Sequence, residues 1–336
     1  MAQNSNDTIL DVRNLQVHFH LDEGVLKAVN GVDFQVRSHQ TVGLVGESGC
    51  GKSVTAQAIL RIVPRPGEVE GQILLRRKWG GAAVDLVKMD ASGREVRDIR
   101  GAEIAMIFQE PMKAFSPVHT IGNQIKEGIL LHTESDEKEA YETAVEMLGR
   151  VQMSNPRQRM GEYPHQLSGG MRQRAMIAMA LACRPSILIA DEPSTALDVT
   201  VQAQVLELMK GLQSELGMAM IFITHDMGVI AEMADEVAVM YLGRIVELAD
   251  VDTLFHQPTH PYTLELLRSL PGLGREPRSR LETIRGTVPV PMNLGPGCGF
   301  GSRCRHCRAG RCDVQVPPLT EVQPGHFVRC YPDTIG

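Results

Sequence analysis

The sequence predicts an α/β fold built on a parallel sheet, and two observations support this. First, short apolar runs alternate with segments of helical length, as in units whose strands run parallel. These segments are residues 187–190, 199–216, 218–224 and 227–233. Second, residues 46–53 fit the phosphate-binding loop pattern G-x-x-x-x-G-K-[ST] without a mismatch. That loop needs a strand before it and a helix after it, and residues 41–45 and 54–63 have those patterns.

The loop itself predicts nucleotide binding. Its glycines let backbone N–H groups turn inward around a phosphate, and the helix N-terminus adds partial positive charge. We expect Lys52 to reach the β- and γ-phosphates and the Ser53 hydroxyl to ligate Mg²⁺. The alternative is an ordinary glycine turn, which the flanking strand and helix disfavour. The residues expected to contact ATP are Gly46, Glu47, Ser48, Gly49, Cys50, Gly51, Lys52 and Ser53.

Length and composition limit the number of domains and the classes of function that the chain can have. A chain of 336 residues has room for one large domain, or one large and one small. The net charge of −6 disfavours a general nucleic-acid binder, which would carry a basic footprint. No apolar run approaches the roughly 20 residues that span a bilayer. The polar first residues lack the basic and apolar regions of a signal peptide, so we expect a cytoplasmic protein without structural disulfides.

The order of elements follows from periodicity and turn residues. Before residue 110 we expect strand 9–19, a strand region 29–36 broken at residues 30–31, strand 67–75, a polar loop or hairpin over 76–101, and strand 104–108. Beyond it we expect a charged helical region over 120–151, a helix over 171–183, and a hairpin of 237–241 with 244–248. Pro, Gly and Arg become frequent after residue 258, which predicts a change of domain near 255–270.

A second nucleotide motif closes the apolar strand 187–190. Asp191 is expected to hold Mg²⁺ through water, and Glu192 follows at the place where an attacking water would lie. An acidic pair after an apolar strand is by itself more often a solvated strand end. The phosphate-binding loop earlier in the same chain favours the nucleotide interpretation.

Residues 167–174 read Leu-Ser-Gly-Gly-Met-Arg-Gln-Arg. Ser168, Gly169 and Gly170 open a helix, so they offer a hydroxyl, N–H groups and a helix dipole to an anion. Here the chain resembles the ATP-binding cassette (ABC) ATPases, whose signature reads L-S-G-G-[QM]. The resemblance implies that two cassettes pack head to tail and that each signature caps the γ-phosphate held by the other. The alternative is an ordinary serine-capped helix.

The same resemblance implies a P-loop NTPase cassette with a parallel-sheet core, an antiparallel β subdomain and a helical subdomain over about 112–168. It also implies further site residues. Gln109 resembles the glutamine that senses Mg²⁺ and the γ-phosphate, Asp198 the aspartate at the dimer seam, and His225 the switch histidine. Glu192, His225 and Gln109 would be catalytic, while Ser53, Gln109 and Asp191 would serve Mg²⁺. Phe19 is expected to stack on adenine, with plain core packing as the alternative.

Three further stretches resemble the ATPase subunits of peptide and nickel importers: residues 109–112, 163–171 and 260–263. This implies a nucleotide-binding domain over 1–257 and an oligopeptide-transporter-type extension over 258–336. It implies ATP hydrolysis that powers uptake of di- or oligopeptides, at the cytoplasmic face of the inner membrane. The implied partners are two permeases, a second homologous ATPase subunit and an extracytoplasmic substrate-binding protein. Residues 110–117 would receive a permease coupling helix, or form an ordinary loop.

Five of the seven cysteines lie after residue 297. The resemblance implies that Cys298, Cys304, Cys312 and Cys330 ligate a four-iron four-sulfur (4Fe–4S) cluster. Independently, thiols in a Gly/Pro-rich tail too small for a sound core suggest a metal cross-link. Zinc is an alternative because Cys304-x-x-Cys307 is a zinc spacing with His306 beside it, and free or redox-active thiols are another. The arginines that could offset thiolate charge are Arg303, Arg305, Arg308, Arg311 and Arg329.

Other functions remain open at this point. The solute could be nickel or another small molecule, since the permeases and binding protein select it. An ABC ATPase acting on nucleic acid is a second alternative, although the sequence has no fused second cassette or basic arm. A regulatory ATP-switched module without transport is a third. The sequence does not decide whether the cassette pair is homo- or heterodimeric.

Overall fold

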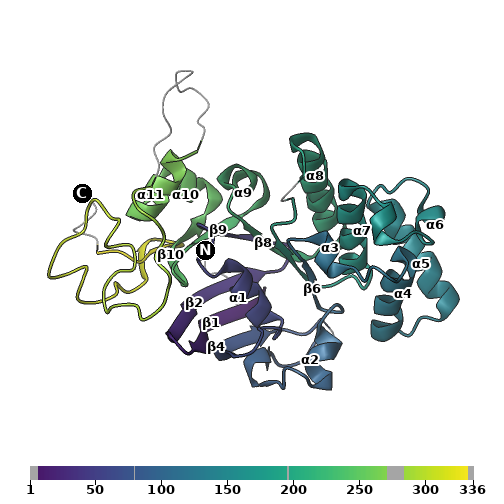
Figure 1. The fold of residues 1–336 in the computed structure, drawn as a ribbon, viewed down its shortest axis with the longest axis horizontal. Helices are drawn as coiled ribbons and strands as arrows, with labels where there is room; N and C mark the ends of the chain where they lie inside the picture. Colours follow the sequence, from purple (N-terminus) through teal and green to yellow (C-terminus); the bar gives the residue numbers. More distant parts are fainter. Residues whose placement is uncertain (1–6, 79, 195–196, 271–283, 332–336) are drawn as a thin grey trace.

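The computed structural model describes residues 7–78, 80–194, 197–270 and 284–331, and its strands form two sheets (Figure 1). The smaller, antiparallel sheet has the order β2 (Gly24–Arg37), β1 (Thr8–Leu21), β4 (Gly67–Leu75), β5 (Val84–Asp85). The larger sheet has the order β11 (Thr320–Gln323), β12 (His326–Val328), β10 (Arg244–Asp250), β9 (Glu236–Tyr241), β3 (Thr41–Val45), β8 (Ala219–Thr224), β7 (Ile187–Asp191), β6 (Ile104–Ile107).

The larger sheet has a parallel centre. Strands β9, β3, β8, β7 and β6 pair in parallel, whereas β10 and β12 join antiparallel at one side. Every residue of β3, β7 and β8 is buried. Such continuous apolar runs are typical of parallel strands covered on both faces. The α/β prediction with a parallel core is therefore confirmed.

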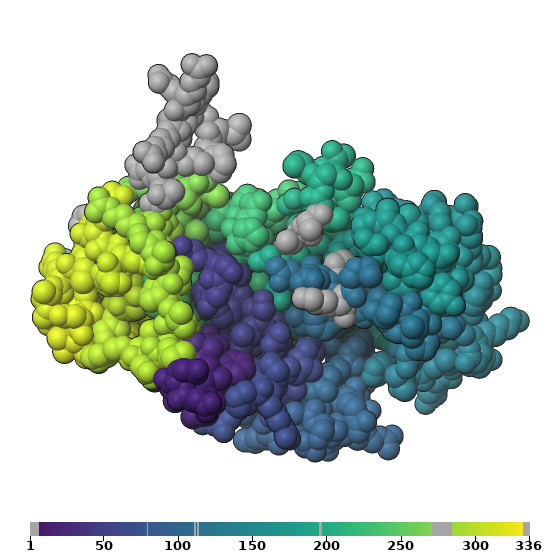
Figure 2. Space-filling model, viewed as in Figure 1, coloured from purple at the N-terminus to yellow at the C-terminus, as the bar shows by residue number. Residues whose placement is uncertain are grey.

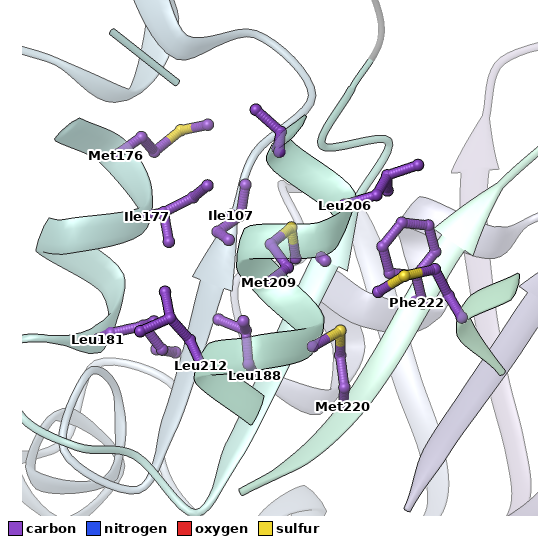
Figure 3. Close-up of a cluster of buried hydrophobic side chains, with 14 of the residues drawn as sticks. Ile107, Met176, Ile177, Leu181, Leu188, Leu206, Met209, Leu212, Met220 and Phe222 are labelled. Carbon is purple, nitrogen blue, oxygen red and sulfur yellow. The ribbon is translucent and has the colours of Figure 1, made fainter. Parts of the chain in front are cut away.

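Two long helices cover one face of this parallel centre, as Figure 3 shows. The helices are α7 (Gly169–Leu181) and α8 (Val199–Leu216). Fully burying one large aliphatic side chain contributes roughly 1.5–3 kcal/mol, so this layer is a main source of stability. The side chains that meet there are Ile107, Met176, Ile177, Leu181, Leu188, Leu206, Met209, Leu212, Met220 and Phe222.

The expected helical region over 120–151 consists of two helices, α4 (Ile121–His132) and α5 (Glu137–Arg150). The break between them is set by a capping box, in which Asp136 accepts from the backbone of Glu139 and the Glu139 side chain accepts from the backbone of Asp136. With α6 (Pro156–Arg159) and α7 they lie at one end of the molecule (Figure 1).

The first hundred residues differ from expectation in three places. Strand β2 is continuous through residues 30–31, because Gly31 adopts a φ of 81° that lets the strand bend without ending. Residues 76–101 contain β5, the 3₁₀ turn η1 (Leu86–Lys88) and helix α2 (Arg94–Ile99), so the expectation of a loop or hairpin alone is wrong. Helix α1 (Lys52–Ile59) ends before residue 63. Helix α2 was not expected because its six residues are too few to show a helical period in the sequence.

The short elements α3 (Pro111–Ala114) and η2 (Pro164–Gln166) flank the helical region, and α9 (Met227–Met233) follows β8. Helices α10 (Val251–His256) and α11 (Pro261–Arg268) come after the hairpin of β9 and β10, which has the predicted turn at Gly243. Helices α10 and α11 lie beside the larger sheet, at the end of the molecule opposite α4 to α6 (Figure 1).

The C-terminal extension joins the main sheet. Strand β12 pairs with β10 at Glu247 and Val328. The fully buried Glu247 carboxylate accepts from the backbone N–H groups of Thr259, at 2.7 Å, and His260, at 3.0 Å. His326 Nε2 lies 2.8 Å from the same carboxylate. A buried charge needs such partners, so the extension is tied to the sheet by a polar network as well as by strand pairing.

The extension also shares the apolar core, because Tyr262 and Phe300 belong to the large core cluster. Figure 2 shows its yellow-green atoms lying directly against the purple atoms of the first strands. The boundary between 1–257 and 258–336 stays a prediction, and residues 271–283 and 332–336 lie outside the described part of the chain.

Candidate nucleotide site

The predicted site residues follow neighbouring parallel strands. Strand β3 leads into the phosphate-binding loop, β6 is followed by Gln109, β7 ends at Asp191, and β8 is followed by His225. The carboxyl ends of parallel strands share one edge of the sheet, where ligands of open α/β sheets bind. The strand order therefore gathers residues from four distant parts of the chain.

Two glycines of the loop have no room for a side chain. A Cβ on Gly46 would lie 2.2 Å from the carbonyl oxygen of Met240, and one on Gly51 would lie 2.3 Å from that of Ala28. Both residues have positive φ, 148° and 104°. The loop then enters α1, whose first residue is the buried Lys52. Lys52 Nζ donates to the carbonyl oxygens of Gly46, at 2.8 Å, and Glu47, at 3.2 Å.

Two of the three residues expected to serve Mg²⁺ lie together, whereas Gln109 donates to Glu192 and its role toward the ion stays a prediction. Ser53 Oγ donates to Asp191 Oδ1 at 3.0 Å, which joins the start of α1 to the end of β7. Burial raises the pKa of Asp191, and the Ser53 hydrogen bond opposes that shift. Hydroxyl and carboxylate oxygens are hard ligands of the kind Mg²⁺ prefers. The donor set therefore fits the ion, which would both neutralise the carboxylate and bind phosphate oxygens.

The three expected catalytic residues form one connected group. Gln109 Nε2 donates to Glu192 Oε2 at 2.9 Å, and His225 Nδ1 lies 3.1 Å from Glu192 Oε1. Glu192 adopts a φ of 47°, and its N–H donates to the carbonyl oxygen of Ile223 at 2.9 Å. A left-handed conformation at a non-glycine residue costs on the order of 1–3 kcal/mol and is found preferentially at functional sites. Both oxygens of one carboxylate are thus positioned from adjacent strand ends.

One pocket opens over these elements. Its lining includes Phe19, Ser48, Gly49, Gly51, Lys52, Ser53, Gln109 and Glu192. Phe19 is half-buried and also packs against the core cluster of the antiparallel sheet, so both interpretations of this residue have a structural basis. Its stacking on adenine stays a prediction.

The same pocket has a wall that the sequence did not indicate. Residues Val288, Pro289, Val290 and Pro291 of the C-terminal extension line it. They are held against β2, because Lys27 N–H donates to the carbonyl oxygen of Pro291 at 2.9 Å. A short apolar segment far along the chain carries no nucleotide motif, so only the fold could place it here.

The signature residues lie elsewhere. Ser168 caps α7 by accepting from the N–H of Met171 at 3.3 Å. Ser168 and Gly169 are exposed, and outside its chain neighbours and the backbone of its own helix no described atom lies within 4 Å of the position of a Gly169 Cβ. Asp198, also exposed, caps α8 by accepting from Val201 N–H at 3.0 Å. Neither motif lines the pocket formed by this chain's own phosphate-binding loop. Their expected role toward a second cassette stays a prediction.

The five C-terminal thiols line one small pocket, together with His260 and Phe300. The thiols belong to Cys298, Cys304, Cys307, Cys312 and Cys330. The N–H of His306 donates to the sulfur of Cys304 at 3.4 Å, and that of Arg308 to the sulfur of Cys312 at 3.5 Å. Burial raises the pKa of Cys304 to about 11, so its thiol is protonated at neutral pH.

Within the described ranges, no group of three or more His, Cys, Asp or Glu side chains is arranged to hold a metal ion. Three of the arginines expected to offset thiolate charge also point to other partners. Arg303 pairs with Glu47, Arg305 lies 3.3 Å from Glu265, and Arg329 donates to the carbonyl oxygen of Ile245. These three guanidinium groups are thus also held by contacts outside the thiol pocket, and a role of the arginines in offsetting thiolate charge stays a prediction.

No helix in the part of the chain that the structure describes has the length and apolar character needed to cross a membrane.

Comparison with known proteins gives two family matches. Residues 29–195 match the family described as ABC transporter, and residues 246–312 match the oligopeptide/dipeptide transporter C-terminal region. A protein of Sinorhizobium fredii named "Probable peptide ABC transporter ATP-binding protein" is 50% identical over 327 residues, 97% of this chain and 95% of its own. The oligopeptide transport ATP-binding protein AppD of Bacillus subtilis is 48% identical over 326 residues, 96% of each chain.

Solved structures share the fold. A dimeric ATP-binding cassette in a post-hydrolysis state, bound to ADP and Pi, superposes with a TM-score of 0.63 at 24% identity. The match covers 72% of this chain and 99% of that one. At this identity the likeness supports the cassette fold alone.

Proposed function

Because this chain belongs to the ABC transporter family, we propose that it is the ATP-hydrolysing subunit of an importer that carries di- or oligopeptides across the cytoplasmic membrane. The observation that carries this proposal is the 50% identity with a peptide transporter ATP-binding protein over 97% of the chain. The second family match, over residues 246–312, supports the peptide branch because that family is described as the C-terminal region of oligopeptide/dipeptide transporters.

The phosphate-binding loop would bind the phosphates of ATP. Inward-facing N–H groups of residues 46–53 and the start of α1 would hold the β- and γ-phosphates. Lys52 would leave the carbonyl oxygens of Gly46 and Glu47 and donate to the phosphates instead. Ser53 and Asp191, already joined at 3.0 Å, would hold Mg²⁺, which neutralises charge on the transferring phosphoryl group.

Glu192 would act in the hydrolysis step. Its carboxylate would orient or deprotonate the attacking water, and the amide of Gln109 keeps it in place by donating at 2.9 Å. His225, 3.1 Å from the other oxygen, would contact the γ-phosphate. Gln109 and His225 can each move from Glu192 to a phosphate oxygen. Their positions would then depend on whether the γ-phosphate is bound.

Two copies of the cassette are needed in this mechanism. The exposed Ser168 and Gly169 open a helix that lies outside the chain's own pocket, which suits a role on nucleotide held by a partner. Asp198 would lie at the seam between the two cassettes. Hydrolysis would remove the phosphate that both cassettes hold and so favour the open dimer. Whether the partner is identical or a related subunit stays open.

The remaining partners follow from the transport role. Two integral permeases and an extracytoplasmic substrate-binding protein would complete the importer, with this chain at the cytoplasmic face of the membrane. Residues 110–117 are proposed to dock a permease coupling helix, because they follow Gln109 directly and lead into the helical region. A γ-phosphate sensed by Gln109 could in this way alter the permease contact.

The test is reconstitution with the permeases and binding protein from the same operon or genome neighbourhood, in liposomes. We expect ATPase activity to rise when the binding protein carries di- or oligopeptide. Stimulation by nickel or another small solute, and not by peptide, would replace the substrate assignment. ATPase stimulation by DNA or RNA without permeases would overturn the transport function itself.

We also propose that the five-thiol pocket holds a 4Fe–4S cluster when the protein is made with iron and sulfide. The convergence of Cys298, Cys304, Cys312 and Cys330 on one pocket supports it, as do the N–H···S bonds to two of them. Zinc is the alternative, with Cys304-x-x-Cys307 as its spacing and His306 beside it. Cys307 lines the same pocket and is the alternative ligand for the cluster.

Iron and acid-labile sulfide content after anaerobic purification tests this second proposal. We expect iron together with broad visible absorbance, both lost in the Cys304→Ser variant and retained in Cys183→Ser, whose sulfur lies outside the pocket. A colourless protein loaded with zinc would favour the zinc alternative. A metal-free protein with reactive thiols would leave only the redox alternative.

A further inference from the structure

The C-terminal extension reaches the phosphate-binding loop through a buried ion pair. Arg303 Nη1 donates to Glu47 Oε2 at 2.7 Å, and Nη2 donates to Glu47 Oε1 at 3.0 Å. The Arg303 side chain is only 5% exposed, and that of Glu47 is 25% exposed. A two-pronged guanidinium–carboxylate pair fixes direction as well as distance. Glu47 is the second residue of the loop, between Gly46 and Ser48.

The arginine is itself held rigidly. Its Nε donates to the carbonyl oxygen of Arg285 at 2.7 Å, and Nη1 also donates to the hydroxyl of Tyr241 at 3.3 Å. The guanidinium carbon lies 5.7 Å from the ring centre of Tyr241 and 5.9 Å from that of Phe300. The carboxylate hydrogen bonds raise the pKa of Arg303, so the cation is permanent. This arginine therefore has one orientation, set by Arg285 and Phe300 of the extension together with Tyr241 of β9.

A second contact from the extension reaches the backbone of the same loop residue. The N–H of Glu47 donates to the hydroxyl of Tyr262, at the start of α11, at 2.9 Å. Tyr262 is fully buried, and its ring packs 4.8 Å from that of Tyr241 and 5.4 Å from that of Phe300, centre to centre. The carbonyl oxygen of Glu47 in turn accepts from Lys52. The N–H, the side chain and the carbonyl of one loop residue thus all have partners.

We propose that Arg303 is a positioning residue for ATP: through the forked ion pair with Glu47, the C-terminal extension holds the phosphate-binding loop in its nucleotide-binding conformation. This inference rests on the proposed function, because it assigns Arg303 to the ATP site of that function. Arg303 does not itself line the nucleotide pocket. It acts on the loop by preventing Glu47 from turning, which would otherwise displace the backbone of the loop.

Preorganisation of a loop lowers the cost of ordering it on binding, so its loss weakens affinity more than it slows the chemical step. The catalytic group around Glu192 comes from β6, β7 and β8 and makes none of the contacts of Arg303 described above. Removing the ion pair should therefore raise Kd and KM for ATP while kcat changes little. A residue that only stabilises the fold would not produce that separation.

The experiment compares four forms of the full chain: wild type, Arg303→Leu, Glu47→Gln and the double variant. Binding is measured with a fluorescent ATP analogue, and KM and kcat by steady-state ATPase assay. We expect Arg303→Leu to raise Kd about five- to tenfold, with kcat within about twofold of wild type. In the Glu47→Gln background, Arg303→Leu should add less than in wild type, since the charged partner that accepts at both oxygens is already lost.

Arg305→Leu is the matched control. Arg305 lies two residues further along the same segment and pairs with Glu265, away from the loop. It should leave nucleotide affinity unchanged. Equal Kd values for wild type and Arg303→Leu would overturn the inference, as would equal effects of the two arginine variants. If Arg303→Leu does not fold, Arg303→Lys, which keeps the charge without the fork, should bind ATP with a Kd above that of wild type; a wild-type Kd for it would count against the inference.

The inference and the proposed function fail differently. A wild-type chain that binds no ATP would overturn both. A wild-type chain that binds ATP with the same affinity as Arg303→Leu and Arg303→Lys would overturn the inference alone.

Discussion

Gln109 and Glu192, 83 positions apart in the sequence, are joined by a hydrogen bond of 2.9 Å from the amide Nε2 to the carboxylate Oε2. His225 approaches the other oxygen of the same carboxylate at 3.1 Å. One acidic group is therefore fixed between residues that follow β6 and β8, the strands on either side of β7. Fixing a carboxylate at both oxygens suits a group that must direct a water molecule.

Replacing this carboxylate should separate binding from chemistry. In Glu192→Gln the amide cannot take a proton from water, so we expect turnover to fall at least about 100-fold. ATP affinity should stay within a few-fold of wild type, because the loop residues and Lys52 are unchanged. Phosphate release and binding of a fluorescent ATP analogue measure the two properties. Hydrolysis at the wild-type rate would show that Glu192 does not have the assigned role.

The exposed start of α7 predicts a defect that appears only in the dimer. Ser168→Asp keeps a good helix cap but adds a negative charge where a partner's γ-phosphate would lie. In the Glu192→Gln background, which should trap ATP, we expect the ATP-dependent dimer seen by light scattering to disappear. Ser168→Thr keeps the cap without the charge and should still dimerise. A trapped dimer in Ser168→Asp would exclude the signature from the interface.

Burial of His260 predicts acid sensitivity of the extension. Complete burial lowers the pKa of His260 from 6.5 to about 3, and its Nδ1 accepts from the N–H of Tyr262 at 3.1 Å. Below pH 6.5 His260 becomes protonated in the unfolded chain, whereas in the folded chain it stays neutral down to about pH 3. Stability contributed by neutral His260 is therefore present above pH 6.5 and falls as the pH decreases, by about 2 kcal/mol at pH 5.

His260→Asn tests that loss, because asparagine can cap α11 but does not titrate. Urea unfolding at pH 7.5 and pH 5 should show a smaller decrease in unfolding free energy for the variant than for wild type. Parallel decreases in the two proteins would assign the acid sensitivity to other groups.

The loop glycines predict a contrast between two alanine substitutions. Gly51→Ala places a methyl group 2.3 Å from the carbonyl oxygen of Ala28 at a φ of 104°, so the loop must move and ATP binding should be lost. Gly211→Ala lies in α8, where nothing is within 4 Å of the new Cβ. It should stabilise the chain by up to about 1 kcal/mol, since alanine favours helix. Calorimetric melting and ATP binding distinguish the two, and normal ATP binding by Gly51→Ala would contradict the loop geometry.

The local elements were largely predictable. The apolar strand that ends at Asp191, the helix Val199–Leu216 and the charged helical region after Thr120 have periods long enough to be recognised. The short helix Arg94–Ile99 was missed, because six residues carry too little pattern, and the bend at Gly31 was interpreted as a break in the strand.

By itself, the sequence determined the phosphate-binding loop, the helix caps and the alternation of strand and helix. These depend on residues within a few positions of one another, where backbone geometry and side-chain period act directly. Only the tertiary structure decided that Glu192 lies between Gln109 and His225, and that Arg303 forms an ion pair with Glu47. Such contacts depend on the order of strands and on the return of the C-terminal extension to the sheet, and burial of the whole core selects that arrangement.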